Sequence, residues 1–231
     1  MHVVIAGGHG QVARRLTREL VAQGHTVAGL VRNTEHGPDL QDDGARPVVL
    51  DLERASVADL AAVLEGADAV VFSAGAGPGS GDARKQTVDL GAAVLLADAA
   101  ERAGVRRYLL VSSMGVEGVR DGATPEGAEP GFVVYLRAKL AAEEDLRRRD
   151  LDWLIVRPGR LTDEPGTGRV RLDAGTGRSD VPRDDVAAVL AALLERLRRD
   201  PGAGRRLLEL VAGDDPVTEA VERATTGGAP S

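Results

Sequence analysis

The stretch HVVIAGGHGQVA, residues 2–13, decides the fold of this 231-residue chain. Residues 2–6 form a short apolar run rich in β-branched side chains, which predicts a buried strand. Gly7 and Gly10 follow directly, and residues 11–24 then carry apolar side chains at helical spacing. Glycines at this place permit a tight turn and a close approach of the backbone to a ligand. The stretch therefore predicts a strand, a glycine turn and a helix N-terminus that binds a pyrophosphate.

Strands and helices alternate along the following part of the chain. Apolar runs predict strands over residues 25–32, 45–51, 67–75, 105–113 and 151–159. Amphipathic patterns predict helices over residues 56–66, 82–103 and 132–149, with a polar loop over 115–131. Buried strands that alternate with helices indicate a parallel sheet with helices on both faces. The predicted fold class is therefore α/β, a doubly wound parallel sheet of the Rossmann type, with residues 1–159 as its dinucleotide-binding domain.

The pattern changes after Gly159. Residues 160–182 are rich in Gly, Thr and Asp, which is typical of irregular structure. Two short strands, a helix and a final strand are then predicted over residues 168–172, 179–182, 183–199 and 205–213. We expect residues 160–231 to complete the same domain as a small C-terminal extension that covers the substrate, with a disordered tail over residues 224–231.

The composition excludes several classes of function. A net charge of −7 and an aromatic content of 2% argue against a nucleic-acid partner, which needs basic charge or stacking aromatic rings. The chain has no cysteine, and its four histidines lack the spacing of metal ligands, so no metal site is expected. No apolar run reaches the length of a membrane span or resembles a signal peptide. The expectation is a cytoplasmic monomer or homodimer that acts on a small molecule, without a membrane partner.

One tyrosine and one lysine lie four residues apart in a chain that has only two of each. These are Tyr135 and Lys139, in the helix predicted over residues 132–149. Chance alone would give this spacing about 2% of the time. Residues four apart share one face of a helix, so the ammonium would lie beside the phenol and stabilise its phenolate. Such a phenol can exchange a proton with a carbonyl or an alcohol during hydride transfer.

The glycine spacing over residues 7–13 and the Tyr-x-x-x-Lys pair resemble the extended and atypical short-chain dehydrogenase/reductases. The resemblance implies a catalytic serine at the end of the strand predicted over 105–113, with Ser113 as the first choice and Ser112 as the alternative. It also implies an Asn in the helix predicted over 82–103, but Asp89 occupies that place. An Asp there is found in one atypical subgroup, whose members are described as NAD(P)-dependent epimerases or reductases.

The Asp89 position leaves two interpretations open. Asp89 could take part in catalysis with Ser113, Tyr135 and Lys139. It could instead pair with Lys139, which would counteract the activation of the phenol, because an ionised Asp accepts hydrogen bonds and donates none.

The end of the second predicted strand favours one cofactor. An Asp or Glu at this place would bind the ribose hydroxyls of NAD, but this chain has Arg32, whose guanidinium can bind the 2′-phosphate of NADP with two hydrogen bonds. NADP(H) is therefore favoured over NAD(H), unless Arg32 only caps a surface loop. By resemblance, Asp51 and Leu52 contact the adenine, although Asp51 could instead cap the next helix. The full set of expected cofactor-binding residues is Gly7, Gly10, Gln11, Val12, Arg32, Asp51, Leu52, Ser73, Ala74, Gly75, Tyr135, Lys139, Pro158 and Gly159.

The sequence thus predicts an NADP(H)-dependent oxidoreductase that transfers hydride to or from a small carbonyl or alcohol. A flavin or biliverdin-type reductase is a variant of this prediction. Two alternatives remain. The first is an epimerase or dehydratase that uses bound NAD(P) transiently, and the second is a regulatory protein that senses NADP(H) without turnover.

Overall fold

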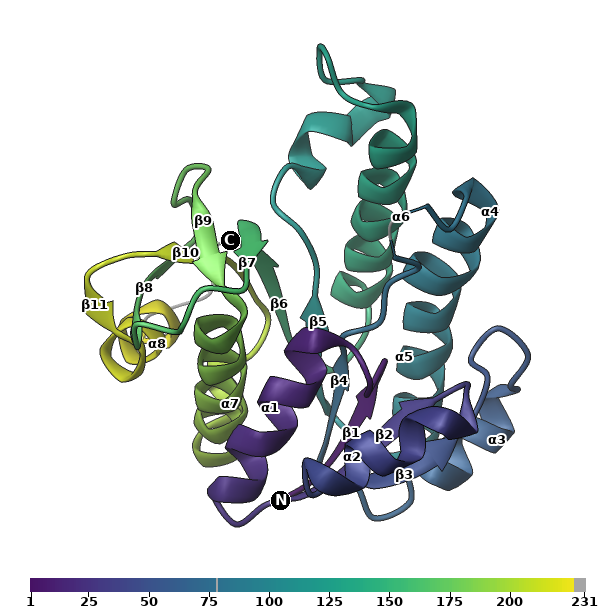
Figure 1. The fold of residues 1–231 in the computed structure, drawn as a ribbon. Helices are drawn as coiled ribbons and strands as arrows, with labels where there is room; N and C mark the ends of the chain where they lie inside the picture. The colour runs from purple at the N-terminus through teal and green to yellow at the C-terminus, as the bar shows by residue number, and fades with distance from the viewer. Residues whose placement is uncertain (78, 227–231) are drawn as a thin grey trace.

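The computed structural model of the chain describes residues 1–77 and 79–226. In this part of the chain, nine strands form one sheet in the order β11-β8-β10-β6-β5-β4-β1-β2-β3 (Figure 1). The strands are β1 (His2–Ala6), β2 (Thr26–Val31), β3 (Arg46–Val49), β4 (Ala69–Phe72), β5 (Arg107–Val111), β6 (Asp152–Pro158), β8 (Arg169–Asp173), β10 (Arg206–Ala212) and β11 (Asp215–Pro216). Neighbouring strands from β3 to β10 are parallel, whereas β8 is antiparallel to β10 and β11 is antiparallel to β8. The doubly wound sheet predicted from the sequence is confirmed.

Helices cover both faces of this sheet because side chains alternate along its strands. Val3 and Ile5 of β1 belong to one buried apolar cluster, and Val4 and Ala6 belong to another. The first cluster is completed by α1 (Gln11–Ala22), α2 (Gly37–Asp42), α7 (Arg183–Arg199) and α8 (Val217–Thr225). The second is completed by α3 (Val57–Val63), α5 (Ala92–Ala103) and α6 (Pro130–Arg147).

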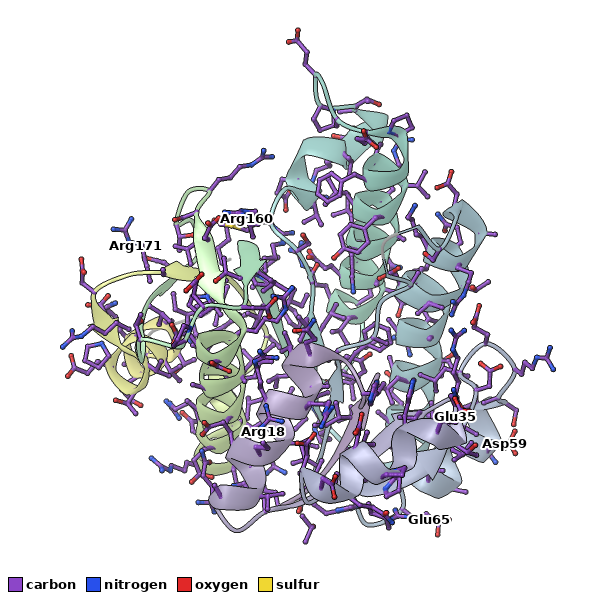
Figure 2. The ribbon with its side chains drawn as sticks, viewed as in Figure 1. Arg18, Glu35, Asp59, Glu65, Arg160 and Arg171 are labelled. Atoms are coloured by element: carbon purple, nitrogen blue, oxygen red, sulfur yellow. The ribbon has the colours of Figure 1, made fainter. Side chains whose placement is uncertain are left out.

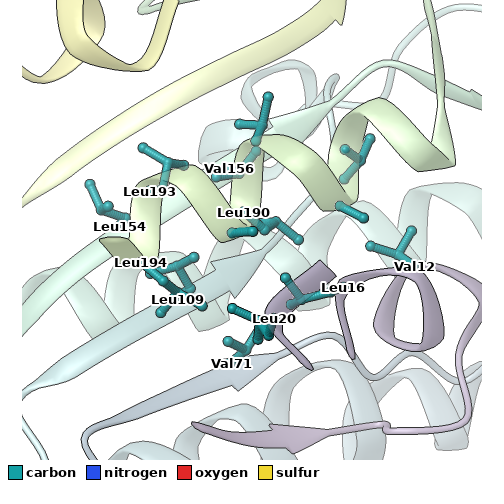
Figure 3. Packing of buried hydrophobic residues seen from close by; sticks show 14 of the residues in the cluster. Val12, Leu16, Leu20, Val71, Leu109, Leu154, Val156, Leu190, Leu193 and Leu194 are labelled. Atoms are coloured by element: carbon teal, nitrogen blue, oxygen red, sulfur yellow. The ribbon is translucent and has the colours of Figure 1, made fainter. Parts of the chain in front are cut away.

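The contact between α1 and α7 fixes the N-terminus of α1 against the sheet. Leu16 and Leu20 of α1 face Leu190 and Leu194 of α7 over the central strands (Figure 3). All four side chains are fully buried, and burying a leucine stabilises the fold by about 1.5–3 kcal/mol. Other charged side chains lie at the periphery, as Asp59, Glu65 and Arg171 do in Figure 2.

The helix predicted over residues 82–103 is divided into three segments. A short helix α4 (Asp82–Arg84) leads into a π-helical segment, Lys85–Gly91, and α5 follows. A π-helical turn holds an extra residue and is common at functional sites. Asp89 is the buried residue of this segment.

Several short elements were not predicted from the sequence. They include α2, α8, β11 and β7 (Arg160–Thr162), which pairs with β9 (Asp180–Pro182) outside the main sheet. The polar loop over 115–131 contains a 3₁₀ segment, Val116–Gly122, and further 3₁₀ turns lie at Thr34–His36 and Pro201–Ala203. Each of these elements is short, so its periodicity in the sequence is weak.

The predicted disordered tail begins too early. Ala224 and Thr225 belong to α8, where the buried Thr225 hydroxyl donates a hydrogen bond to the Val221 carbonyl at 2.7 Å. Burial of Ala220 and Val221 against α7 explains why the helix continues this far. Residues 227–231 of that predicted tail lie outside the described residues.

The order of the strands places a crevice at the end of β1. The sheet extends from β1 to β2 on one side and to β4 on the other, and both contacts are parallel. Loops after β1 and β4 therefore leave the same edge of the sheet in different directions. Ligands of open α/β sheets bind at such a switch point.

Candidate functional site

Two cavities lie along this edge of the sheet. The smaller has a volume of about 310 Å³ and the larger a volume of about 1000 Å³. Both are lined by Gly10 and by residues 73–75, so they meet between the glycine turn after β1 and the end of β4. An elongated ligand with two ends could occupy both cavities across this junction.

The glycine turn is built for close approach of the backbone. Gly7 has a φ of +79°, and a Cβ on it would lie 2.6 Å from the Ala74 Cα. The Gly10 N–H donates to the Gly7 carbonyl at 2.8 Å, which closes the turn. Gly10 is the N-cap of α1, and no side chain in the described residues caps it. The first amide groups of α1 are therefore available to an anion at the junction.

The smaller cavity lies at the ends of β2 and β3. It is lined by Arg32, Asp51 and Leu52, which the sequence analysis expects to bind the cofactor, and also by Glu53 and Arg84. The two last residues were not expected. Glu53 follows the predicted Asp51-Leu52 pair directly and could have been included, whereas Arg84 reaches the cavity from α4 and no sequence signal placed it there.

The charged groups of the smaller cavity interact with one another. Arg84 Nη2 lies 2.9 Å from Glu53 Oε2, and Arg32 Nη1 lies 3.8 Å from the same oxygen. The Thr87 hydroxyl donates to Glu53 Oε1 at 2.6 Å. This hydrogen bond from Thr87, together with Arg84, lowers the pKa of Glu53 below its ordinary value. Glu53 is therefore a carboxylate within the cavity wall.

Two stacked histidines complete the wall of the smaller cavity. The rings of His9 and His36 are nearly parallel, with centroids 3.7 Å apart. His9 Nε2 lies 2.7 Å from Asp39 Oδ2, and this hydrogen bond, with Arg14 nearby, lowers the pKa of Asp39. The contact with Asp39 and the stacking on His36 fix the His9 ring in the wall of the cavity.

Tyr135 and Lys139, the two residues of the Tyr-x-x-x-Lys spacing, both line the larger cavity. Lys139 is 3% exposed. Its Nζ donates to the Ala74 carbonyl at 3.3 Å and to the Val111 carbonyl at 3.2 Å, at the ends of β4 and β5. The same Nζ lies 5.8 Å from the centroid of the Tyr135 ring. These contacts fix the ammonium between the sheet edge and the phenol.

Asp89 is the counter-charge of Lys139. The lysine Nζ lies 3.3 Å from Asp89 Oδ1, and both side chains are buried. Asp89 Oδ2 accepts a hydrogen bond from the Ala76 N–H at 3.2 Å. The pairing between Asp89 and Lys139, one of the two interpretations open from the sequence, is present in the structure.

The structure places the two candidate serines differently. Ser112 is buried and lines the larger cavity, and its hydroxyl donates to Glu143. Ser113 is not among the residues that line either cavity, and its hydroxyl donates to the Met114 carbonyl at 3.1 Å. Adjacent residues at a strand end point in opposite directions, and the sequence could not establish which of the two faces the crevice.

A buried ionic network lies behind Ser112. Glu143 is fully buried, and Arg157 Nε donates to its Oε1 at 2.9 Å. Arg157 is itself buried and also donates through Nη2 to Glu117 Oε1 at 2.7 Å. The Arg157 guanidinium is thus the hydrogen-bonding partner that a buried carboxylate at this place requires.

Pro158 and Gly159 have different surroundings. Pro158 lines the larger cavity, but Gly159 is not among its lining residues. A Cβ on Gly159 would lie 2.0 Å from the Ser179 carbonyl oxygen. The glycine is therefore required by the close approach of the segment before β9, and its contact with a cofactor stays a prediction.

The mouth of the larger cavity was not predicted from the sequence. Phe132 is 49% exposed there, and its ring lies 5.8 Å from that of Tyr135. Further lining residues that the sequence did not single out include Lys85, Glu129, Leu161 and Arg183. They come from segments whose positions depend on the tertiary fold, so no local motif marks them. Among the described residues, no helix is both long enough and apolar enough to span a membrane.

Comparison with known proteins identifies the family. Residues 7–196 match the model of the NAD(P)H-binding family, and the chain belongs to that family. It is 33% identical over 224 residues to the uncharacterised sugar epimerase YhfK of Bacillus subtilis, and the match covers 96% of this chain and 100% of YhfK. The resemblance to NAD(P)-binding reductases and epimerases of the atypical type is therefore confirmed.

Solved structures agree with this assignment. A protein of Bacillus halodurans, whose name places it among NAD-dependent epimerases/dehydratases, has a TM-score of 0.85 and 36% identity over 96% of this chain and 99% of its own. The oxidoreductase ylbE of Lactococcus lactis has a TM-score of 0.82 and 26% identity over 100% of both chains. The chain is thus an NAD(P)-binding member of a group that contains proteins named as epimerases and as oxidoreductases.

Proposed function

We propose that this protein is an oxidoreductase that uses NADP(H) and exchanges hydride with a small carbonyl or alcohol. The observation that carries the proposal is the convergence of two independent motifs on one crevice. The glycine turn after β1 and the Tyr135–Lys139 pair of α6 are far apart in sequence, yet both border the junction formed by residues 73–75. The proposal includes a cytoplasmic location and a monomer or homodimer as the active form.

The residues of the crevice fit a dinucleotide. Uncapped amides of α1 would hold the pyrophosphate, and Gly7 lets the turn pack closely against Ala74, where a Cβ would clash. The smaller cavity would take the adenosine, with Arg32 directed to a 2′-phosphate. The larger cavity would take the nicotinamide and the substrate beside Pro158 and Tyr135. When bound, the nicotinamide supplies or accepts the hydride.

The chain's own groups handle the proton. In the reducing direction, the Tyr135 hydroxyl gives its proton to the substrate oxygen as hydride reaches the carbon. In the oxidising direction, the phenolate accepts the proton of the alcohol. Lys139 stabilises the phenolate, and Asp89 weakens this effect, because its opposite charge lies 3.3 Å from the ammonium. We assign the serine beside the reacting oxygen to Ser112 rather than Ser113, because Ser112 lines the cavity.

Two other functions have one observation each in their favour. The name of the YhfK relative favours an epimerase, in which the nucleotide would stay bound and return to its starting redox state. The Asp89–Lys139 pair favours a sensor of NADP(H), because an ammonium that is paired with a carboxylate activates the phenol less. A sensor would bind NADPH without turnover, and an epimerase would retain the nucleotide through purification.

The proposal is tested in two stages. NADPH and NADH are titrated against the purified protein by nicotinamide fluorescence, and the tighter binder is then used in a screen of small carbonyls and alcohols. We expect NADPH to bind more tightly. Y135F should lower turnover by about 100-fold or more while leaving NADPH binding nearly unchanged. If neither nucleotide binds, or if Y135F turns over as the wild type does, the proposal is wrong.

The two serines provide a matched comparison in the same assay. S112A should lower turnover at least about tenfold, because it removes a polar group from the cavity wall. S113A should leave turnover nearly unchanged, since this side chain is not among those that line either cavity. Equal effects of the two substitutions would contradict the assignment of Ser112.

A further inference from the structure

The smaller cavity contains two opposite charges, and only one of them favours the 2′-phosphate of NADP(H). Arg32 is the group expected to meet a 2′-phosphate, but Glu53 lies in the same wall with a carboxylate oxygen 3.8 Å from Arg32 Nη1. A carboxylate at this place would repel a phosphate and would accept hydrogen bonds from ribose hydroxyls. Arg32 alone therefore does not establish a preference for NADP(H).

Two contacts hold Glu53 more closely than its long ion pair with Arg32 does. Arg84 Nη2 contacts Glu53 Oε2 at 2.9 Å, and the Thr87 hydroxyl donates to Oε1 at 2.6 Å. Each carboxylate oxygen thus has a short contact with the segment that begins at α4. The contact with Arg32, at 3.8 Å, is too long for a hydrogen bond.

The exposed fractions of the side chains agree with a Glu53 that is bound by Arg84 and an Arg32 that stays accessible to a ligand. The Glu53 side chain is 25% exposed, and the Arg84 side chain is 33% exposed. The Arg32 side chain is 58% exposed. Arg32 is therefore the cation of the cluster that a ligand can reach most readily, and Arg84 is the one that neutralises Glu53.

We propose that Arg84 sets the cofactor preference by holding Glu53, which leaves Arg32 for the 2′-phosphate of NADP(H). This inference rests on the proposed function, because it requires that a dinucleotide places its adenosine in the smaller cavity. Without Arg84, the ion pair of Glu53 with Arg32 shortens, and the cavity then presents a carboxylate to the ribose, as an NAD-binding site does. Arg84 acts here through Glu53 and is a positioning residue.

A double-mutant cycle tests the inference on the full-length protein. The dissociation constants of NADPH and NADH are measured by fluorescence for the wild type, R84Q, E53Q and E53Q/R84Q, in a phosphate-free buffer of fixed ionic strength. R84Q should lower the preference for NADPH over NADH by about tenfold, since the Glu53 carboxylate then faces the 2′-phosphate, which has the same sign of charge. E53Q/R84Q should restore the preference, because the Glu53 carboxylate that would repel the 2′-phosphate is then absent. E53Q alone should keep it.

A matched control separates local action from the general loss of a positive charge. Arg54 follows Glu53, is exposed, and is not among the residues that line the smaller cavity. R54Q removes the same charge close by and should leave the preference unchanged. Circular dichroism of each variant verifies that it is folded.

The outcomes distinguish the two proposals. A wild-type protein that binds neither nucleotide overturns the proposed function. A wild type that prefers NADPH, with the same preference in R84Q, overturns only the role of Arg84. Loss of preference in R84Q without recovery in E53Q/R84Q also overturns it, because Arg84 would then contact the phosphate directly. An equal loss in R54Q overturns it as well, since the effect would be one of net charge.

Discussion

At the scale of single residues, the Asp89–Lys139 pair contributes both to the stability of the fold and to the structure of the candidate site. Both groups are buried, and the lysine also holds carbonyl groups at the ends of β4 and β5. Removal of one member of a buried ion pair leaves an uncompensated charge, whereas replacement of both by apolar groups is often tolerated.

This difference gives a prediction for stability. K139M should lower the free energy of unfolding by about 3–5 kcal/mol. The double variant K139M/D89L should recover most of the loss, because no buried charge is left without a partner. Urea denaturation at neutral pH measures both values. If the double variant is no more stable than K139M, the buried charge is not the cause of the loss.

The predictability of the site depends on how each residue is attached to the fold. Gly7, Arg32 and Asp51 follow strands whose apolar runs are visible in the sequence, so their place at one sheet edge could be predicted. Tyr135 and Lys139 were found from helical spacing alone. Arg84 and Arg183 could not be found in this way, because their positions depend on how α4 and α7 pack against the rest of the chain.

At the scale of elements, the segment over residues 82–103 shows what a periodic pattern leaves out. The sequence predicts one continuous helix there, but the structure has α4, the π-helical segment Lys85–Gly91 and α5. The spacing of apolar residues indicates that a segment is helical, but it does not indicate an extra residue in one turn. Asp89 and Thr87, two groups that hold other site residues, lie in this segment.

Helix α8 offers a second prediction at this scale. Val221 is buried in the cluster shared with α7, and Thr218 is exposed in the same helix. V221D should lower the free energy of unfolding by more than about 2 kcal/mol, because it buries a carboxylate without a partner. T218D should have little effect, since an Asp near a helix N-terminus interacts favourably with the macrodipole.

Thermal or urea denaturation of the two variants measures the difference. An unchanged stability in V221D would mean that α8 does not contribute its buried face to the core in solution.

At the scale of the whole molecule, the alternation of buried runs and helical patterns was sufficient for the fold class. Seven strands of the sheet are parallel neighbours, and each is near a predicted strand. The edge beyond β10 was less predictable. There β8 and β11 are short and antiparallel, and their pairing depends on contacts between distant parts of the chain.

Surface ion pairs give a prediction for the response of the molecule to acid. Arg198 and Arg199 hold the pKa of Glu195 at about 2, below its ordinary value of 4.5. A lowered pKa in the folded state means that this stabilisation is present above pH 4.5 and is lost as the pH falls towards 2. The wild type should therefore lose more stability over this range than E195Q does. Urea midpoints at several pH values in the range provide the measurement, and identical slopes for the two proteins would contradict it.

A hydroxyl group has a single hydrogen, and the Ser112 hydroxyl uses it for the hydrogen bond to Glu143. Glu143 receives that hydrogen and is itself bound by Arg157, so in this arrangement the Ser112 oxygen presents its lone pairs to the larger cavity. Any group that comes to rest against it must bring a hydrogen of its own. In the proposed reaction, the hydroxyl of an alcohol can therefore donate a hydrogen bond to Ser112, whereas the oxygen of a carbonyl must receive its hydrogen bond from Tyr135.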